Sequence, residues 1–226
     1  ENYRLIQSTC PGAEVGAAVK ADAYGLGVGP VTAALSDAGC TTFFVATPAE
    51  GTHLRKTNAT AEIVVLNGPE PGNIATLLDS RLTPTLNSLP QIETWAAPSA
   101  NAPMEAWLHI DTGMSRLGLT PAECESAGDR LKGFNINLVM SHLACADEPA
   151  NPKNQEQLAL FNKLRSFISA DQASLAASSG VYLGPDFHFD LSRAGVSLYG
   201  VNPMPGRSNP MAQVVRLQAK ILQTRS

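Results

Sequence analysis

The chain has 226 residues, of which 44% are hydrophobic and 16% are charged, so it can bury the core of one large α/β domain or of two small domains. Its formal net charge of -4 argues against a nucleic-acid-binding surface, which needs a basic patch. Because no apolar run approaches the length of a membrane span, we expect neither nucleic acid nor a membrane as a partner.

The cysteines and histidines are too scattered for a disulfide framework or a metal site, with no C-x-x-C pair and no zinc-ligand spacing. The residues concerned are Cys10, Cys40, Cys124, Cys145, His53, His109, His142 and His188. We therefore expect reduced thiols, a cytoplasmic location and no metal.

Short apolar runs alternate with helical segments along the chain. The runs predict strands at residues 15–19, 43–46, 63–66, 82–86, 104–110, 136–140, 175–177 and 196–199. The segments between them predict helices at 30–38, 48–56, 72–79, 88–97, 121–131 and 154–168, and residues 1–6 have the pattern of the end of a helix. Thr47 and Glu50 occupy capping-box positions at the start of the helix at 48–56.

Strands that alternate with helices in this number predict a (β/α)8 TIM-type barrel, an α/β fold. The rival is an open doubly wound sheet. A dinucleotide site in such a sheet needs G-x-G-x-x-G, and Pro30 stands where the third glycine should follow Gly25 and Gly27, so this signal is weak. Residues 213–223 alternate like a further strand that has no partner in the barrel pattern.

Lys20 ends the first buried strand, where desolvation disfavours its ammonium group. The same desolvation makes the amine a usable nucleophile that can hold a carbonyl cofactor as a Schiff base. A lysine that snorkels from a strand end to solvent is the ordinary alternative. The residues of this strand alone leave both interpretations open.

Other polar residues follow later strands and would meet Lys20 at the mouth of a barrel, where the carboxyl ends of the strands converge. They are 111–116 after the fifth strand, His142 after the sixth, 178–180 after the seventh and 193–196 at the eighth. Each has an ordinary interpretation, as a surface arginine, a core histidine or a turn. We interpret Asp186, His188 and Asp190 as a solvated loop.

Barrels commonly bind phosphate with the loops after strands seven and eight. The small residues of 178–180 and 194–196 suit that task. A phosphate there, together with a reactive lysine on strand one, points to pyridoxal 5′-phosphate as the cofactor.

With these residues assembled, the sequence resembles the alanine racemases, which are barrel-type (fold-type III) pyridoxal-phosphate enzymes. Four segments carry the resemblance: AVKADAYGLG at 18–27, HIDTGMSRLG at 109–118, MSHLACADE at 140–148 and FDLSRAGVSLYG at 189–200. The resemblance implies that residues 1–206 form the cofactor-binding N-terminal barrel and that 207–226 begin the connection into a second, β-rich domain.

The resemblance implies catalytic roles for three residues. Lys20 would hold the cofactor as a Schiff base and, once freed by substrate, act as the base on one face of Cα. Arg116 would bond the phenolic oxygen of the cofactor and lie near the substrate carboxylate. His142 would pack against the cofactor ring or its hydrogen-bond network.

The resemblance also implies how the cofactor is bound. Tyr24 would donate to the phosphate, aided by Ser178 and by the backbone of Gly195 and Val196. Arg193 would face the pyridine nitrogen and leave it unprotonated, because a guanidinium cannot give up a proton. Such a ring is a weaker electron sink, which limits side reactions.

Two positions depart from the family. Many members have a carbamylated lysine that braces the arginine where this chain has His109. A neutral histidine could brace Arg116 only as an acceptor, whereas a protonated one would repel it. The family often has asparagine where this chain has Ala177.

The function that the resemblance implies is interconversion of L- and D-alanine for peptidoglycan precursors, by a homodimer in the full-length protein. The second domain would supply the opposite-face catalytic tyrosine across the dimer. Since the chain stops at Ser226, we expect a fragment that is impaired in racemisation. The alternatives are a cofactor-binding barrel without turnover and a related decarboxylase, and the DTGMSRLG stretch argues against the decarboxylase.

Overall fold

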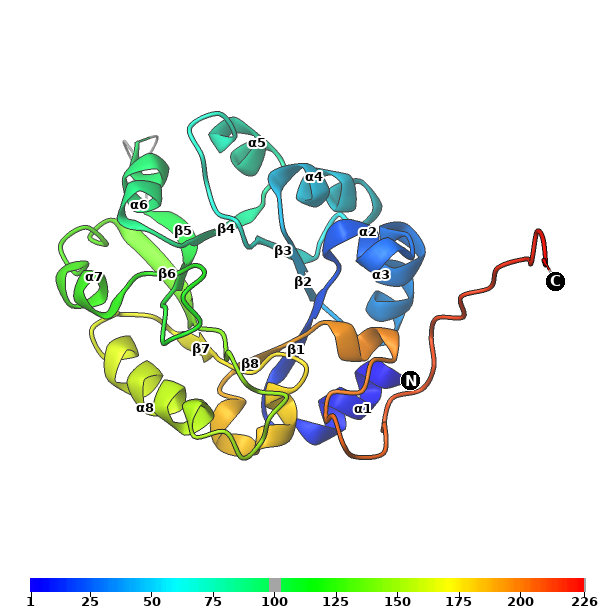
Figure 1. Cartoon of the computed structure of the whole chain (residues 1–226). Helices are drawn as coiled ribbons and strands as arrows, with labels where there is room; N and C mark the ends of the chain where they lie inside the picture. The colour runs from blue at the N-terminus through cyan, green and yellow to red at the C-terminus, as the bar shows by residue number, and fades with distance from the viewer. Residues whose placement is uncertain (98–102, 226) are drawn as a thin grey trace.

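Parallel strands form a closed barrel in the structure, a computed structural model that describes residues 1–97 and 103–225 (Figure 1). The strands pair in the order β7-β6-β5-β4-β3-β2-β1-β8. Their bounds are β1 (Glu14–Ala18), β2 (Thr42–Val45), β3 (Glu62–Val65), β4 (Thr83–Leu86), β5 (Met104–His109), β6 (Phe134–Met140), β7 (Gln172–Ser174) and β8 (Leu191–Ala194). A parallel bridge between Ala177 and Arg193 closes the ring between β7 and β8.

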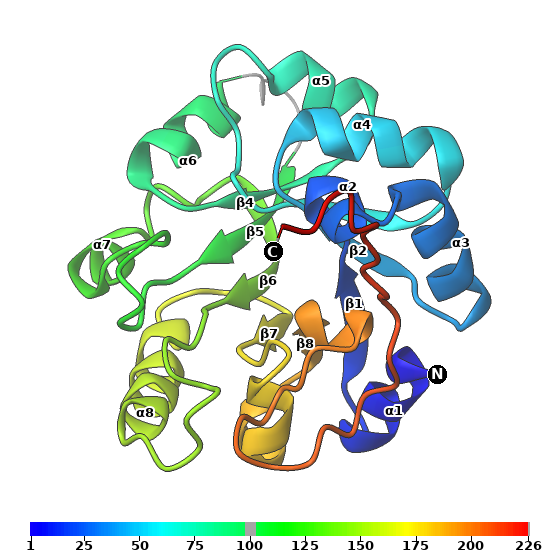
Figure 2. The same cartoon turned by 45° about the vertical axis from the view of Figure 1, so that its right-hand side comes forward.

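Helices surround the strands on the outside (Figures 1 and 2). Their bounds are α1 (Asn2–Thr9), α2 (Lys20–Gly25), α3 (Val28–Asp37), α4 (Pro48–Thr57), α5 (Ile74–Asp79), α6 (Leu89–Ala96), α7 (Pro121–Ser126) and α8 (Lys153–Arg165), with 3₁₀ helices η1 (Gly180–Leu183), η2 (Pro185–Phe187) and η3 (Val196–Tyr199). This alternation confirms the predicted (β/α)8 barrel, and the predicted capping box of Thr47 and Glu50 is present at α4. Within the described ranges, every helix falls short of the length and apolar character that a membrane crossing requires.

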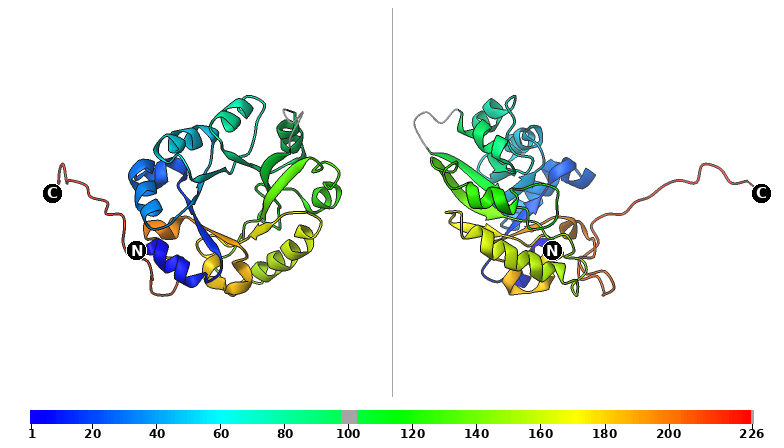
Figure 3. Two further views of the ribbon diagram at one scale, coloured as in Figure 1. Left: turned by 180° about the vertical axis from the view of Figure 1, so that it is seen from behind. Right: turned by 60° about the vertical axis from the view of Figure 1, so that its left-hand side comes forward.

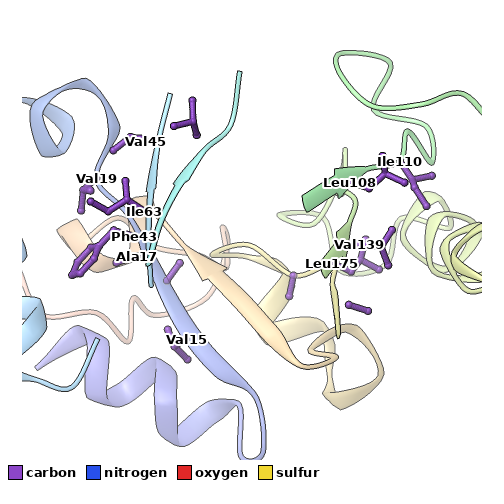
Figure 4. Close-up of a cluster of buried hydrophobic side chains, with 14 of the residues drawn as sticks. Val15, Ala17, Val19, Phe43, Val45, Ile63, Leu108, Ile110, Val139 and Leu175 are labelled. Carbon is purple, nitrogen blue, oxygen red and sulfur yellow. The ribbon is translucent and has the colours of Figure 1, made fainter. Parts of the chain in front are cut away.

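Alternate residues of the strands belong to two separate buried clusters, because successive side chains of a strand point to opposite faces. The larger cluster packs the strands against the helices, and Figure 4 shows part of it, including Phe43 and Val45 of β2. The smaller cluster lies inside the barrel and contains Phe44 from the same strand. The interior is full, since a Cβ added to Gly16 of β1 would lie 2.6 Å from Cε2 of Phe44.

Several predicted boundaries were wrong. β7 lies at 172–174, before the predicted 175–177, and the predicted eighth strand at 196–199 is the 3₁₀ helix η3. The real β8 has the sequence LSRA, whose polar residues hide its strand pattern. The helix predicted at 121–131 ends at Ser126. The loop expected after 97 falls partly on 98–102, outside the described residues.

The strand predicted at 213–223 is also wrong, because residues 207–225 contain neither helix nor strand. They leave the barrel as an extended segment (Figure 3). Leu217, Ile221 and Leu222 are 95%, 83% and 94% exposed, so their alternation reflects no packing within the described chain. The start of this segment is anchored, because the Ala212 N–H donates to Oδ1 of buried Asn2 at 2.7 Å.

Candidate active site

A cavity of about 540 Å³ opens at the carboxyl ends of the strands. It is lined by every residue that the sequence predicted for the site: Lys20, Tyr24, Arg116, His142, Ser178, Arg193, Gly195 and Val196. They come from the loops after β1, β5, β6 and β7 and from β8 and its following turn. The barrel therefore brings together side chains that are up to 176 positions apart in the sequence.

Lys20 is half-buried at the mouth, at the start of a strained turn. Residues 21–24 all have left-handed backbone angles, with φ between 52° and 57°. Each such non-glycine residue costs roughly 1–2 kcal/mol, so the turn needs support from its surroundings. Part of that support is the carboxylate of Asp22, which accepts the Val28 N–H at 2.7 Å.

Small and hydroxyl-bearing residues form one end of the cavity. The Tyr24 ring packs on Tyr199 with 4.6 Å between ring centroids. Ser178 Oγ accepts the Gly195 N–H at 2.9 Å. A Cβ added to Gly195 would lie 2.9 Å from the Tyr24 hydroxyl oxygen, so the absence of a side chain there leaves the hydroxyl accessible. This end has the hydroxyl and backbone donors that a phosphate group requires.

Arg193 is a buried cation in the wall of the cavity, 5% exposed. Its guanidinium donates to Ser174 Oγ and to the carbonyl oxygens of Ser141 and Leu175. Burial lowers the pKa of Arg193 to about 9, which leaves the group charged at neutral pH. Three acceptors, one at the end of β7 and one each in the residues directly after β6 and β7, hold this charge in one orientation.

His109 and Asn87 form a hydrogen-bonded pair next to Arg116. The Asn87 Nδ2 donates to the carbonyl oxygens of Leu66 at 3.0 Å and Thr85 at 3.1 Å, so its Oδ1 must be the atom that faces His109 Nδ1 at 2.9 Å. His109 Nδ1 therefore carries the proton, and Nε2 is left as an acceptor. Burial, aided by the charges of Arg193 and Arg116, lowers the pKa of His109 to about 3.

His142 is also neutral. Burial lowers its pKa to about 3, and the charges of Arg193 and Arg116 and the neighbouring His109 and Lys20 act in the same direction. Among the described residues, the side chains of Lys20, Tyr24, Arg116 and His142 have no hydrogen-bonding partner. Four polar groups around one cavity are thus free to bind a ligand.

Arg116 is presented by a loop that folds back on itself. The Asp111 carboxylate accepts the N–H groups of Gly113 at 2.8 Å and Ser115 at 3.1 Å. Gly118 has a φ of +109°, and a Cβ there would lie 2.7 Å from the Asp111 nitrogen, so only glycine fits this close approach. Asp111 and Gly118 of the D-T-G-M-S-R-L-G stretch are therefore required by the shape of the loop that carries the arginine.

Gln157 of α8 joins this loop to the one that carries His142. Its Nε2 donates to Thr112 Oγ1 at 3.0 Å and to the His142 carbonyl at 2.9 Å, and its Oε1 accepts the Ala144 N–H at 2.8 Å. The side chain is fully buried. Gln157, Asn87 and Tyr199 were not predicted from the sequence. The available signal for Gln157 was a polar residue on the helix face that also carries Phe161.

The interpretation of 186–190 as a solvated loop is wrong for His188, which is 6% exposed and donates Nε2–H to the Val181 carbonyl at 2.7 Å. Asp190, although exposed, accepts the Ala173 N–H at 2.8 Å. None of these residues lines the cavity. In the described part of the chain, no group of three or more histidine, cysteine or acidic residues is arranged to hold a metal ion.

Comparison with known proteins places this site in a family. Residues 1–203 match the family model described as alanine racemase, N-terminal domain. The catabolic alanine racemase of Mesorhizobium japonicum is 48% identical over 231 residues, which cover 100% of this chain and 61% of the relative. The alanine racemase of Rhodospirillum rubrum is 52% identical over 221 residues, which cover 95% of this chain and 59% of the relative.

Solved structures that resemble this chain are also alanine racemases. The alanine racemase from Bartonella henselae with covalently bound pyridoxal phosphate has a TM-score of 0.89 and 35% identity to this chain, covering 94% of it and 63% of that structure. The biosynthetic alanine racemase from Pseudomonas aeruginosa has a TM-score of 0.85 and 36% identity, covering 93% and 59%. This chain spans about three fifths of the length of the curated relatives it matches. By its fold, its motifs and these matches, the chain belongs to the alanine racemase family.

Proposed function

We propose that this chain is the cofactor-binding part of a pyridoxal-phosphate-dependent enzyme that interconverts L- and D-alanine and thereby supplies D-alanine for peptidoglycan. The observation that carries the proposal is the convergence of Lys20, Arg116 and Arg193 with the Tyr24–Gly195 end on one cavity of about 540 Å³. The names of the relatives support it, as does the cofactor bound in the Bartonella structure.

The residues fit the chemical groups of pyridoxal phosphate. Lys20 offers an amine for the aldehyde, and the hydroxyls of Tyr24 and Ser178 and the backbone N–H of Val196 offer donors for the phosphate. The Gly195 N–H already donates to Ser178 Oγ and orients that hydroxyl. When bound, the cofactor delocalises the negative charge that develops at Cα as the α-proton leaves. We propose that residues 1–206 form this binding unit and that 207–226 lead away from it.

Each side chain has a separate role in the proposed reaction. Lys20 takes or returns the α-proton on one face of Cα. Arg193, a charged guanidinium with three protein acceptors, would face the pyridine nitrogen without protonating it, which would restrain competing reactions. Arg116 would bind the phenolic oxygen and the substrate carboxylate, His109 would offer Nε2 as an acceptor beside Arg116, and neutral His142 would pack against the ring.

Covalent attachment to Lys20 tests the cofactor proposal. Protein mixed with pyridoxal phosphate and reduced with borohydride should carry the cofactor on the peptide that contains Lys20, as measured by mass spectrometry. Lys20→Ala should remove this label, whereas Lys153→Ala, beside the Arg116 loop, should keep it. Labelling that survives in Lys20→Ala would refute the assignment.

Hydrogen exchange at Cα tests the racemase proposal. Racemisation needs a proton acceptor and a donor on opposite faces, and Lys20 serves one face. We therefore expect residues 1–226 to exchange the α-hydrogen of one alanine enantiomer with deuterated water faster than they interconvert the two, as followed by NMR and chiral chromatography. Equal rates for the two processes would contradict this expectation.

The two alternatives make different predictions in the same samples. A cofactor-binding barrel without turnover would be labelled at Lys20 but would exchange no α-hydrogen. A decarboxylase would release carbon dioxide from basic amino acids. The placement of Arg116 at the cavity, where it can bind a carboxylate that is retained through the reaction, favours the racemase.

We also propose that the enzyme works as a homodimer in the cytoplasm. An apolar groove beside the mouth supports the first part; it is lined by Tyr24, Leu26, Val196, Val201 and Val214, all more than a third exposed. The free thiols of all four cysteines suit a reducing compartment. Sedimentation velocity of the protein, with and without pyridoxal phosphate, measures the assembly state.

A further inference from the structure

Two helices in this protein begin with the same four residues, T-P-A-E, at 47–50 and at 120–123. Both form a capping box, in which the threonine hydroxyl accepts the glutamate N–H and the glutamate carboxylate accepts the threonine N–H. The two glutamates nevertheless bind different partners. The comparison therefore separates what a helix cap needs from what Glu50 does in addition.

The carboxylate of Glu123 stays within its own cap. Its Oε2 accepts the Thr120 N–H at 2.8 Å and the Thr120 hydroxyl at 2.8 Å; Thr120 is exposed and Glu123 is partly exposed. Nothing in these contacts reaches the cavity. Glu123 therefore shows what the T-P-A-E sequence does when it serves only as a helix cap.

The carboxylate of Glu50 reaches out of its cap on both sides. Its Oε2 accepts the Ala46 N–H at 2.7 Å, directly after β2, whereas the Thr47 N–H of its own cap lies at 3.4 Å. Its Oε1 accepts the Ala21 N–H at 2.9 Å. That N–H belongs to the peptide bond that follows Lys20. Glu50 thus connects the end of β2 to the peptide between Lys20 and the left-handed turn.

The turn at 21–24 has separate supports at its far end, where Asp22 accepts the Val28 N–H and the Tyr24 ring packs on Tyr199. At its near end, the Ala21 N–H can find no partner within a left-handed turn that starts at the same residue. Glu50 supplies that partner from a neighbouring βα unit. The orientation of the Lys20 peptide is therefore set by a carboxylate 30 positions later in the sequence.

We propose that Glu50 is a positioning residue for Lys20: it holds the Lys20–Ala21 peptide so that the lysine amine reaches the aldehyde carbon of the cofactor. The inference rests on the proposed function, because it assigns that aldehyde as the partner of Lys20. It concerns covalent attachment, in which Nζ bonds to the aldehyde carbon and water leaves, and it leaves binding of the phosphate end to Tyr24, Ser178 and Gly195.

Binding of two ligands can distinguish a Glu50 variant that misplaces Lys20 from one in which the whole cavity is disturbed. Pyridoxal phosphate requires Lys20 for attachment, whereas pyridoxine phosphate has an alcohol in place of the aldehyde and binds only by its phosphate and ring. We expect Glu50→Ala to slow borohydride-trapped labelling of Lys20 at least about tenfold, while the dissociation constant for pyridoxine phosphate changes by less than about threefold.

Glu123→Ala is the matched control, because it removes the same capping carboxylate from the same four-residue sequence. Its labelling rate should stay within about twofold of wild type. Glu50→Gln keeps the size of the side chain but can accept from only one of the two N–H groups, so it should also slow labelling. Thr47→Ala weakens the cap, keeps the bond to Ala21, and should label normally.

Equal labelling rates for wild type, Glu50→Ala and Glu50→Gln would overturn the assignment while leaving the proposed function intact. So would a loss of pyridoxine phosphate binding that parallels the loss of labelling, because Glu50 would then support the whole site. Failure of the wild-type protein itself to be labelled would refute the proposed function and this inference with it.

Discussion

Burial, aided by positive charge around the cavity, keeps His109 and His142 neutral, and this makes the stability of the protein depend on pH. The pKa of His109 is lowered to about 3 by burial and by Arg193 and Arg116, whereas an unfolded histidine titrates near 6.5. Below pH ~6.5 the unfolded chain therefore binds a proton that the folded chain does not. Stability is fully present above this pH and falls as the pH drops towards 3.

Replacement of His109 by glutamine should reduce that pH dependence. Each neutral buried histidine contributes up to about 1.4 kcal/mol per pH unit, so between pH 7 and 5 the variant should lose about 1–2 kcal/mol less unfolding free energy than wild type. Urea denaturation of the cofactor-free protein at each pH measures this. His53→Gln, at an exposed position, should keep the wild-type slope, and so would His109→Gln if His109 were already charged in the folded protein.

The lack of a side chain at Gly195 keeps the phosphate end of the cavity open. A Cβ there would lie 2.9 Å from the Tyr24 hydroxyl and force it aside. Gly195→Ala should weaken pyridoxal phosphate binding about tenfold. Gly29→Ala is the control, because a Cβ at Gly29 meets nothing within 4 Å and that variant should bind normally. Absorbance titration compares the two, and equal affinities would show that the hydroxyl does not bind the phosphate.

At the scale of elements, α8 does more than cover the barrel. Its Gln157 satisfies polar groups in the loops after β5 and β6, which carry Arg116 and His142. The helix therefore sets how these two loops lie relative to each other. A side chain without polar atoms at this position would take a hydrogen-bonding partner from the Ala144 N–H, from the His142 carbonyl oxygen and from the buried Thr112 hydroxyl.

Gln157→Leu should for this reason destabilise the protein by about 2–4 kcal/mol, although the change in volume is small. Gln155→Leu, on the exposed face of the same helix, should change the unfolding free energy by less than about 0.5 kcal/mol. Urea denaturation at pH 7 measures both variants. Similar values for the two would mean that the Gln157 hydrogen bonds contribute nothing net.

At the scale of the whole molecule, the barrel ends where its packing ends, near residue 212. Met211 is 6% exposed, and Asn2 of α1 exchanges two hydrogen bonds with Ala212, at 2.7 and 2.9 Å. Beyond Arg216 the apolar side chains are exposed. The first and last parts of the barrel are thus joined to each other, and the residues after 216 add nothing to the described core.

Two truncations test this boundary. Removal of 217–226 should leave the unfolding free energy within about 0.5 kcal/mol of the full chain. Removal of 210–226 takes away Met211 and the two hydrogen bonds between buried Asn2 and Ala212, and should cost about 2–4 kcal/mol. Thermal and urea unfolding measure both. A large effect of the shorter truncation would show that the terminal residues pack on the barrel in solution.

The sequence by itself determined the barrel, most of its strands and eight of the residues that line the cavity. Short apolar runs and capping boxes are local signals, so residues such as Phe43, Phe44 and Val45 indicate a strand without knowledge of its neighbours. The motifs at 18–27 and 109–118 contain glycines with positive φ, and glycine is itself a local signal for a turn. The weak strands β7 and β8 were misplaced because polar side chains, used for the site, interrupt their pattern.

Only the tertiary structure decided which polar groups support that site. Glu50, Asn87 and Gln157 act across 22 to 45 positions of sequence, on Lys20, His109 and Thr112. The proton on His109 follows from the partners of Asn87 and from nearby guanidinium groups, none of which is a property of the histidine itself. The physical reason is that hydrogen bonds and charge interactions depend on distance in space, and closure of the barrel sets those distances.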